Sequence, residues 1–393
     1  MSDLASPGRP SRQSFDIVLM AATFLEEFKG EVARSVDNDF SDNYDALRFG
    51  PLPPSPSARG FAVKKWVKQH LSRKGYLRPQ ETAALIEHSL GFAAPWLARL
   101  EKLHSLLADS ESKSLLVKLM AFRALGHRKI KLPFNAPALR EGIKQMERVT
   151  VQADSLPAGF MGWTLNRVDL AGLGLPVSLY TIPADAYIMF VAQQYRCLCE
   201  PPLIEAAEGD YVIDGGGCWG DTALYFSHKV GDTGRVWSFE FVPANLEIMR
   251  RNLDQNLSLK KRVSIVENAL WRKSNESLCY SNNGPGTQVS QENSQHTDQT
   301  ARTLSIDDLV AENKLPRLDF IKMDIEGSEL EALNGAEQTL RQFKPKLAIC
   351  VYHRLEDFFE IPDYLESLGL NYRFFIRHFS IHSEETVLFA RAD

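Results

Sequence analysis

The sequence has few cysteines, no long apolar run and no strong excess of charge. Its five cysteines form no C-x-x-C pair, and no histidine cluster lies beside them. This usage argues against a disulfide framework or a zinc site and fits a reducing cytoplasm. The first 20 residues lack the apolar run of a signal peptide, and no 18-residue apolar stretch occurs. We therefore expect no membrane span and a cytoplasmic location.

The formal net charge of -5 gives no reason to expect nucleic acid or an anionic membrane as a partner. Hydrophobic residues at 44% and charged residues at 24% are typical of a globular protein. A chain of 393 residues predicts two domains, or one domain with a large extension. Nothing in the sequence specifies the oligomeric state.

The first part of the chain carries apolar residues at helical spacing. The segments with this pattern are 15–36, 61–74, 79–91, 95–107 and 111–125. Residues 61–74 are also basic, and we favour a solvated helix face over an anion- or lipid-binding surface. Residues 52–57 have the composition of a linker. We predict a mainly helical region over residues 1–155 and a second domain over 156–393, with its core at 205–393.

From residue 210 on, strand and helix patterns alternate, which predicts a parallel sheet with helices on both faces. The first strand and helix of this series form its most specific pattern. A short apolar strand at 211–213 leads into a turn with Gly215, Gly217 and Gly220 in the spacing G-x-G-x-x-G, and a helical pattern follows. Strand, glycine turn and helix together are typical of a site where the backbone closely approaches a nucleoside cofactor.

Two acidic residues bear on the identity of that cofactor. Asp214 stands directly before the first glycine, where a carboxylate would repel a pyrophosphate and would suit the sulfonium and ammonium of S-adenosylmethionine. Glu240 follows the next strand, about 20 residues past the last glycine, and can receive ribose hydroxyls. Asn268, after the third strand, can then contact the adenine edge. The alternative for Asp214 is that it merely caps the turn.

A second group of candidate residues follows two later strands. Lys322, Asp324 and Glu326 alternate along residues 319–329, and if the strand persists they share one face. They belong to the edge of the sheet where ligands bind in open α/β folds, or they form an ion pair that only orders the turn. His353 follows the next strand and is a candidate general base. The alternative is a histidine bonded to backbone.

Asp324 competes with His353 for the role of base. Asp324 and Glu326 could hold a divalent cation, but the sequence does not supply a full ligand set for one. Residues 281–301 are polar, with almost no apolar side chains. They predict either a mobile flap over the site or a long surface loop.

Three motifs carry a resemblance to a known family. They are Asp214-Gly-Gly-Gly-Cys-Trp-Gly-Asp221, Phe239-Glu240 followed by Pro243 and Asn245, and Asp319-Phe-Ile-Lys-Met-Asp-Ile-Glu-Gly-Ser-Glu-Leu330. Together they resemble the FkbM-type methyltransferases, specifically over residues 205–393 and moderately over 109–204. Gly216 stands where the family often has alanine, and Gly217 where asparagine is frequent.

The resemblance implies a doubly wound, mostly parallel α/β sheet of the class I methyltransferase (Rossmann-like) type. It also implies S-adenosylmethionine-dependent O-methylation of a small-molecule or glycan acceptor, with a hydroxyl on a sugar, glycan or polyketide-like group. On this basis the cofactor would be held by Asp214, Gly215, Gly217, Asp221, Glu240, Asn268 and Asp324. Asp324, Glu326 and His353 would position and deprotonate the acceptor hydroxyl.

Two other classes of function stay open. A nicotinamide-dependent oxidoreductase shares the glycine turn, but Asp214 disfavours it. A non-catalytic nucleoside-binding module would use the same fold without turnover. A comparison of S-adenosylmethionine binding with NAD binding distinguishes the oxidoreductase from the methyltransferase. Methyl release over time distinguishes the non-catalytic module from the methyltransferase.

Overall fold

The computed structural model describes residues 12–40, 43–44, 79–134, 136–160, 162–199, 203–291 and 299–392. The chain divides into two compact units, Met1–Pro133 with Ile381–Ser383, and Phe134–Ser380 with Glu384–Asp393. The predicted linker at 52–57 and the basic helix at 61–74 lie outside the described residues. The predicted domain boundary at 155/156 stays a prediction. In the described residues no helix is both long and apolar enough to cross a membrane.

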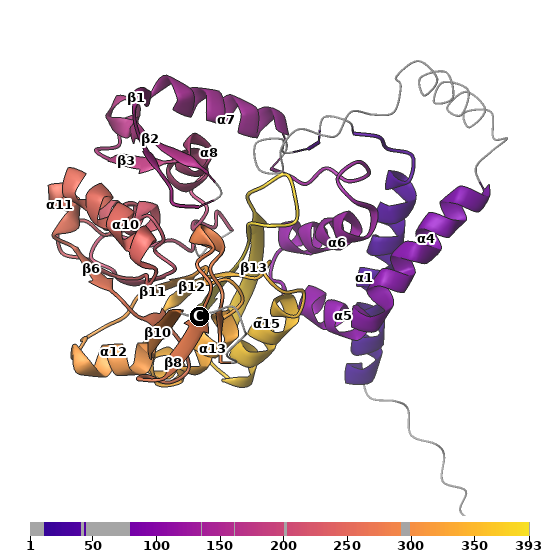
Figure 1. Ribbon diagram of the computed structural model, residues 1–393. Coiled ribbons are helices and arrows are strands. Elements are labelled where there is room, and N and C mark those ends of the chain that lie inside the picture. Colours follow the sequence, from indigo (N-terminus) through magenta and orange to yellow (C-terminus); the bar gives the residue numbers. More distant parts are fainter. Residues whose placement is uncertain are drawn as a thin grey trace, which may run out of the picture. The chain divides into compact units, whose positions relative to one another are not determined.

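The first unit is built from helices (Figure 1). They are α1 (Arg12–Ser35), α4 (Pro79–Ala93), the short 3-10 helix η1 (Ala94–Trp96), α5 (Leu97–Leu106) and α6 (Ser110–Leu125). Helix α1 contacts α4, α5 and α6, and it buries Phe24, Phe28 and Val32, spaced four residues apart along one face. The predicted ends of α6 are confirmed, because Asp109 accepts a hydrogen bond from the Ser112 amide and Gly126 ends the helix at φ 81°.

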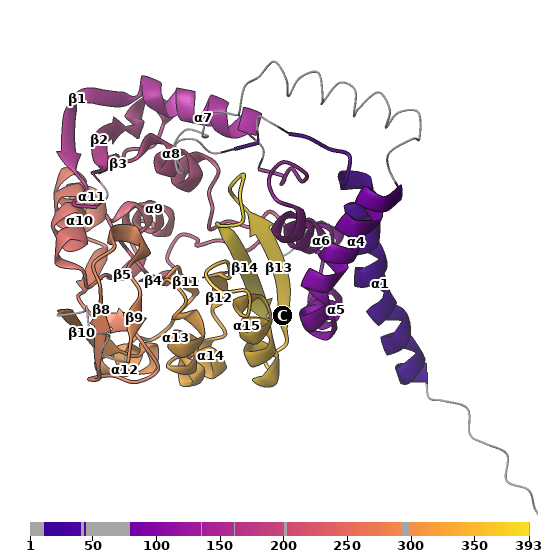
Figure 2. The same ribbon diagram turned by 45° about the vertical axis from the view of Figure 1, so that its right-hand side comes forward.

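The second unit holds a seven-stranded sheet in the order β13-β14-β12-β11-β4-β5-β6 (Figure 2). In chain order its strands are β4 (Tyr211–Gly215), β5 (Arg235–Phe239), β6 (Val263–Val266), β11 (Phe320–Met323), β12 (Lys346–Cys350), β13 (Tyr372–His378) and β14 (Thr386–Ala392). Within this sheet β14 runs antiparallel to both of its neighbours, and the pairs among β6, β5, β4, β11 and β12 are parallel. The predicted doubly wound, mostly parallel sheet is confirmed.

Helices follow the strands and cover the sheet. They are α9 (Asp221–Val230), α10 (Pro243–Gln255), α11 (Leu257–Lys260), α13 (Glu329–Asn334), α14 (Glu337–Phe343) and α15 (Asp357–Ser367). Helices α9, α10 and α11 contact one another, and α9 also contacts β4 and β5, whereas α13 contacts α15. The central strands are apolar and fully buried, with Val212, Ile213 and Ile321 at 0% exposure, as expected for strands covered on both faces.

Two smaller sheets are added to this core. An antiparallel sheet, β1 (Thr150–Pro157), β2 (Thr164–Asp169) and β3 (Ser178–Thr181), precedes the glycine turn in the chain. It is flanked in the chain by α7 (Ala136–Arg148), η2 (Leu170–Leu173), α8 (Pro183–Ala186) and the π-helix η3 (Tyr187–Val191). The other sheet has the order β7-β10-β8-β9 and lies between β6 and β11 in sequence. Its elements are β7 (Ala269–Leu270), β8 (Ser277–Tyr280), η4 (Gly284–Gly286), β9 (Val289–Ser290), β10 (Gln299–Leu304) and α12 (Ile306–Glu312).

This second small sheet includes parts of the segment 281–301, and the choice between a mobile flap and a surface loop stays a prediction. Val289 and Ser290 pair with β8, and residues 299–301 also pair with β8 from its other side. Residues 292–298 lie outside the described part. Composition alone does not separate such short paired strands from a loop.

The strand order fixes where a ligand can bind. From β4 the chain moves outward through β5 and β6, and it then returns to the other side of β4 through β11 and β12. The order therefore reverses between β4 and β11. In open α/β sheets the carboxyl ends of the strands on either side of this reversal leave a crevice for the ligand.

Candidate active site at the reversal between β4 and β11

Asp214, near the end of β4, is fully buried, and both of its carboxylate oxygens contact other protein side chains. One carboxylate oxygen accepts hydrogen bonds from Thr222 Oγ1 at 2.8 Å and Ser238 Oγ at 2.6 Å. The other lies 3.1 Å from Lys322 Nζ, whose side chain is 1% exposed. Asp214 therefore ties β4 to β5, α9 and β11. The structure gives this carboxylate a role in holding the turn, rather than the predicted contact with a cationic ligand.

Lys322, in β11, fixes the glycine turn directly. Its ammonium donates to the carbonyl oxygens of Gly215 at 2.9 Å and Gly216 at 2.7 Å, in addition to its pair with Asp214. Burial alone would lower the pKa of Lys322, but the charges of Asp214 and Asp324 outweigh it and raise that pKa above its usual value. The lysine is therefore a permanent cation beneath the turn.

The turn packs too tightly for any side chain at its centre. Gly216 has φ 81°, and a Cβ atom added there would lie 2.0 Å from the carbonyl oxygen of Asp324. At Gly217 an added Cβ would lie 2.2 Å from Ser238 Oγ. Both positions thus require glycine, because Asp324 and Ser238 fill the space that a side chain would need.

Glu240 lies directly after β5 and is 7% exposed. Its Oε1 accepts hydrogen bonds from the amides of Phe241 at 2.6 Å and Val242 at 2.7 Å, and its Oε2 accepts from Asn245 Nδ2 at 3.1 Å. Burial raises the pKa of Glu240, and these hydrogen bonds act against the rise. The Oδ1 of Asn245, a residue that is 2% exposed, has no hydrogen-bond partner in the described part of the chain. Glu240 and Asn245 thus leave unused acceptor capacity at the end of β5.

An open cavity lies over these strand ends, with about 550 Å³ of free space that is partly continuous with solvent. The described residues that line it are Gly216, Cys218, Phe239, Glu240, Phe241, Val242, Asn245, Asn268, Ala269, Leu270, Gly284, Pro285, Thr287, Val289, Asp324, Ile325, Glu326 and Ser328. None of these lining residues carries a basic side chain, whereas three carry carboxylates. The cavity therefore favours a cationic or polyhydroxylated ligand over a pyrophosphate.

Four of the predicted site residues line this cavity, namely Glu240, Asn268, Asp324 and Glu326. The others, Asp214, Gly215, Gly217, Asp221 and His353, are not among its lining residues. Asn268 is half-buried and donates to the carbonyl oxygen of Arg302 at 3.2 Å. Asp221 begins α9, and burial raises its pKa to about 6.

The predicted common face of Lys322, Asp324 and Glu326 is wrong in its geometry. The strand ends at Met323, and Glu326 has the left-handed φ of 58°. A turn, rather than strand alternation, therefore brings Glu326 to the cavity. This backbone conformation is strained for a non-glycine residue, and such strain gathers at functional sites.

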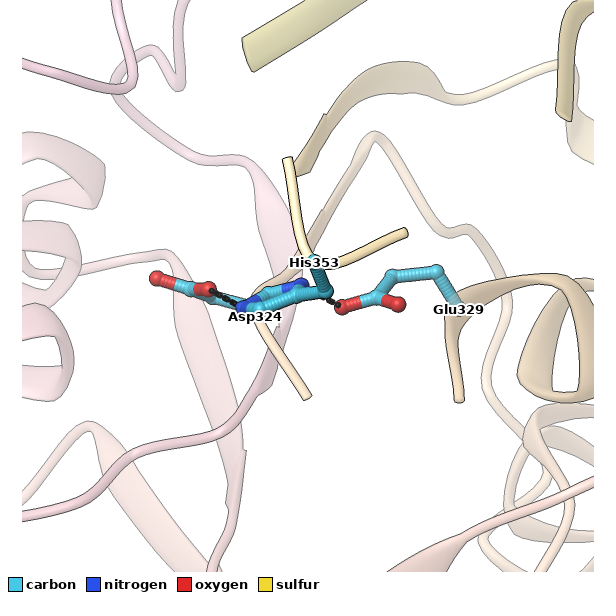
Figure 3. Close-up of side chains that lie close together, drawn as sticks. All are labelled: Asp324, Glu329 and His353. Carbon is cyan, nitrogen blue, oxygen red and sulfur yellow. Dashed lines mark ion pairs between the residues drawn. The ribbon is translucent and has the colours of Figure 1, made fainter. Parts of the chain in front are cut away.

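His353 lies among three carboxylates, two of which are drawn with it in Figure 3. Its Nε2 is 3.4 Å from Asp324 Oδ1 and 3.3 Å from Glu326 Oε1, and its Nδ1 is 3.0 Å from Glu329 Oε1. Burial would lower the pKa of His353, but Glu329, Glu326 and Asp324 raise it to about 12. Without a further cation the ring is therefore an imidazolium at neutral pH, and an imidazolium cannot act as the predicted base.

Asp324 is positioned by the buried Tyr195 and the partly buried Tyr352. Tyr195 donates to Oδ2 at 3.0 Å, and Tyr352 donates to Oδ1 at 3.0 Å. Burial would raise the pKa of Asp324, but His353, Lys322 and the tyrosine hydroxyls hold it below its usual value. Asp324 is thus a fixed anion with both oxygens already engaged, whereas the described chain gives Glu326 only the ion pair with His353.

Sequence reasoning missed four residues of this site: Tyr195, Asn245, Glu329 and Tyr352. Asn245 and Glu329 stand within the motifs that carried the family resemblance, so position in those motifs was an available signal. Tyr352 precedes His353 directly. Tyr195 lies 129 positions before Asp324, and no local pattern connects two residues so far apart.

Comparison with known proteins agrees with this geometry. Residues 204–374 match the methyltransferase FkbM domain family. This part of the chain is an FkbM-type methyltransferase domain. The sequence has no match among curated proteins.

Solved structures of low sequence identity match parts of the chain. A methyltransferase FkbM of Methylobacillus flagellatus KT is 19% identical, with a TM-score of 0.47, and the match covers 78% of this chain and 61% of that one. The chain thus spans less than two thirds of that relative's length. Aeropyrum pernix fibrillarin with bound S-adenosyl-L-methionine is 13% identical, with a TM-score of 0.36 and coverage of 58% and 90%. An O-methyltransferase of Bacillus cereus with bound SAH is 14% identical, with a TM-score of 0.32 and coverage of 57% and 86%.

Proposed function

We propose that this protein is an S-adenosylmethionine-dependent methyltransferase that methylates a hydroxyl of a sugar, glycan or polyketide-like small molecule. One observation carries the proposal: an acidic cavity at the sheet reversal joins the Glu240–Asn245 pair to the Asp324–Glu326–His353 cluster. The FkbM-type domain supports methyl transfer as the reaction.

The residues at the end of β5 fit the cofactor. Asn245 Oδ1 is a buried acceptor without a donor in the described chain, and Glu240 beside it accepts a single hydrogen bond at Oε2. A pair of ribose hydroxyls is a donor set of the required kind. Asn268, Phe241 and Leu270 line the same cavity and would contact the adenine ring of the cofactor. Asp214, Gly215, Gly217 and Asp221 would act by holding the turn rather than by contact.

When bound, S-adenosylmethionine supplies an activated methyl group. The protein then has to align the acceptor hydroxyl and remove its proton. Of the three residues predicted for this step, Glu326 is the best placed to be the base. It lines the cavity, its Oε1 faces His353, and burial raises its pKa. Asp324 and His353 would hold Glu326 and the acceptor in place.

Binding measurements test the cofactor assignment. We expect micromolar binding of S-adenosylhomocysteine by calorimetry and no comparable binding of NAD. Asn245→Leu should weaken S-adenosylhomocysteine binding by about 1–3 kcal/mol, because one ribose hydroxyl loses its acceptor. Asn283→Leu, on the exposed turn beside η4, serves as the control. Equal affinity in the wild type and Asn245→Leu would remove the ribose assignment.

Turnover with a panel of sugars and glycosides tests the base. Glu326→Gln should lower kcat by roughly 100-fold or more, the usual contribution of general-base catalysis, while S-adenosylhomocysteine affinity stays within a few-fold. Near-full turnover in Glu326→Gln would return the role to Asp324 or His353. Slow methyl release from S-adenosylmethionine in every variant and with every acceptor would favour the non-catalytic binding module.

A further inference from the structure

The least satisfied polar group near the cavity is the imidazole of His353. Its side chain is 4% exposed, and neither ring nitrogen makes a hydrogen bond within the described residues. Carboxylates lie at ion-pair distance from both nitrogens. A buried polar group left in this state destabilises the folded protein. Such an atom calls for a partner that is absent from the protein chain itself.

We propose that His353 Nε2, Asp324 and Glu326 bind a divalent metal ion. Nε2 lies 3.4 Å from Asp324 Oδ1 and 3.3 Å from Glu326 Oε1. Ligand atoms about 2.1 Å from one metal lie about 3.0 Å apart at octahedral angles and about 3.4 Å apart at tetrahedral angles. Each of these two spacings from Nε2 therefore suits a pair of ligands on a common ion.

The groups behind these ligands have the arrangement that metal-binding histidines require. Glu329 is 0% exposed, and its Oε1 lies 3.0 Å from Nδ1, the nitrogen on the other side of the ring. The same oxygen accepts the Ile325 amide at 2.9 Å, which fixes the carboxylate in place. A proton kept on Nδ1 by Glu329 leaves the Nε2 lone pair for the metal, as in carboxylate–histidine–metal sites.

Asp324 is held for the same purpose by the hydroxyls of Tyr195 and Tyr352, each at 3.0 Å. One ligand atom from each of Asp324, Glu329 and His353 also lies within 4.8 Å of the others. Glu329 faces Nδ1, however, so we assign it to orienting the ring and assign Glu326 to the metal. Glu329 is thus a positioning residue.

One imidazole and two carboxylates form a mixed nitrogen and oxygen site of the kind taken by Mn²⁺, Fe²⁺ or Zn²⁺. Asp324 and Glu326 line the cavity, so the remaining coordination positions face it. An acceptor hydroxyl bound there would lose its proton more readily to the second oxygen of Glu326. This last step rests on the proposed function, but the metal site itself does not.

Mn²⁺ is the probe, because its free ion gives a strong electron paramagnetic resonance signal. Titration of the full chain, freed of metal by chelation, should show one bound Mn²⁺ per chain. Pulsed measurements on the bound ion should show coupling to one imidazole nitrogen. His353→Gln and Glu326→Gln should each weaken Mn²⁺ binding by at least about 10-fold, and Glu329→Gln should weaken it by a smaller factor. Glu337→Gln, in an exposed ion pair with Arg341, is the matched control.

Wild-type protein without a stoichiometric Mn²⁺ site, or bound Mn²⁺ without nitrogen coupling, would overturn the proposal even if a variant fails to fold. Unchanged Mn²⁺ affinity in folded His353→Gln and Glu326→Gln would do the same. Binding of S-adenosylhomocysteine is measured in parallel with a chelator present. Its persistence without Mn²⁺ binding would refute the metal site alone, and its absence with Mn²⁺ binding would refute the cofactor assignment alone.

Discussion

Lys322 shows how much of the site depends on one buried charge. Its ammonium meets Asp214 and two carbonyl oxygens of the glycine turn, and the side chain is 1% exposed. Removing one partner of such a pair leaves an uncompensated charge in the interior. We expect Lys322→Met to lower the free energy of unfolding by about 3–5 kcal/mol, measured by urea denaturation.

The neighbouring strand offers a control for Lys322. Lys346 in β12 pairs with Asp210 at 2.8 Å, but its side chain is 20% exposed. Lys346→Met should therefore cost far less, about 1 kcal/mol. The double variant Lys322→Met with Asp214→Asn should recover part of the loss, because no buried charge remains. An equal decrease in the free energy of unfolding for the two lysine variants would mean that burial does not increase the contribution of the Lys322 pair to stability.

Asp221 allows a test by pH. Burial raises its pKa from 3.8 to about 6, so the folded protein retains a proton that the unfolded chain has already lost. Its contribution to stability therefore falls as the pH rises from 3.8 to 6 and is constant above this window. Asp221→Asn should match the wild type near pH 3.8 and be about 1–2 kcal/mol more stable at pH 7.

Unfolding curves of both proteins at several pH values between 3.8 and 7 measure this difference. Asp307→Asn, on the first turn of α12, is the control. A constant gap between Asp221→Asn and wild type across the window would show that Asp221 titrates normally. A gain that disappears toward higher pH would show that the pKa of Asp221 is lowered.

At the scale of elements, the sequence pattern predicted the helices, strands and turns whose backbone and burial depend on neighbouring residues in the chain. The strand, glycine turn and helix at 211–230 follow from apolar runs and glycine spacing alone. The left-handed turn at Glu326 did not follow, because a non-glycine residue rarely adopts this backbone conformation and the sequence gives no local signal for it. Of the carboxylates around His353, the sequence predicted Asp324 and Glu326 but not Glu329, and it did not predict the protonation of the ring. Its pKa depends on Glu329, whose proximity only the folded chain sets.

Asn252, in α10, joins three elements. Its Nδ2 donates to the carbonyl oxygens of Tyr180 at 2.9 Å and Trp219 at 2.8 Å, and its Oδ1 accepts the Tyr180 amide at 2.7 Å. The side chain thus pairs with β3 as a neighbouring strand would, and it holds the glycine turn at the same time. Sequence pattern gives no signal for such a residue, since its partners lie 33 and 72 positions away.

Asn252→Leu should leave three buried backbone groups without partners. At about 1–3 kcal/mol for each such group, with partial relaxation, we expect a loss of about 2–5 kcal/mol in unfolding free energy. S-adenosylhomocysteine affinity should fall as well, because the turn loses its link to α10. Asn334→Leu, which removes one exposed bond to the Leu330 carbonyl, is the control. A loss of stability without any loss of S-adenosylhomocysteine affinity would show that Asn252 stabilises the contact with β3 but does not hold the glycine turn for the cofactor.

At the scale of the whole molecule, the division into two compact units has a thermodynamic consequence. The cavity and its surrounding residues belong to the unit of Phe134–Ser380 and Glu384–Asp393. A ligand that binds only the folded form of that unit stabilises it by about 2.7 kcal/mol at 100 times its dissociation constant. The helical unit gains nothing from the ligand if it unfolds independently.

We therefore expect two calorimetric transitions, of which S-adenosylhomocysteine shifts one upward by about 5–10 °C. Hydrogen exchange during heating would assign the shifted transition to peptides from β4, β5 and β11, and the unshifted one to peptides from α1, α5 and α6. NAD at the same concentration should move neither transition, which separates the methyltransferase from the nicotinamide-dependent alternative. A single transition that S-adenosylhomocysteine raises as a whole would show that the two units unfold cooperatively, because ligand bound to one would then stabilise both.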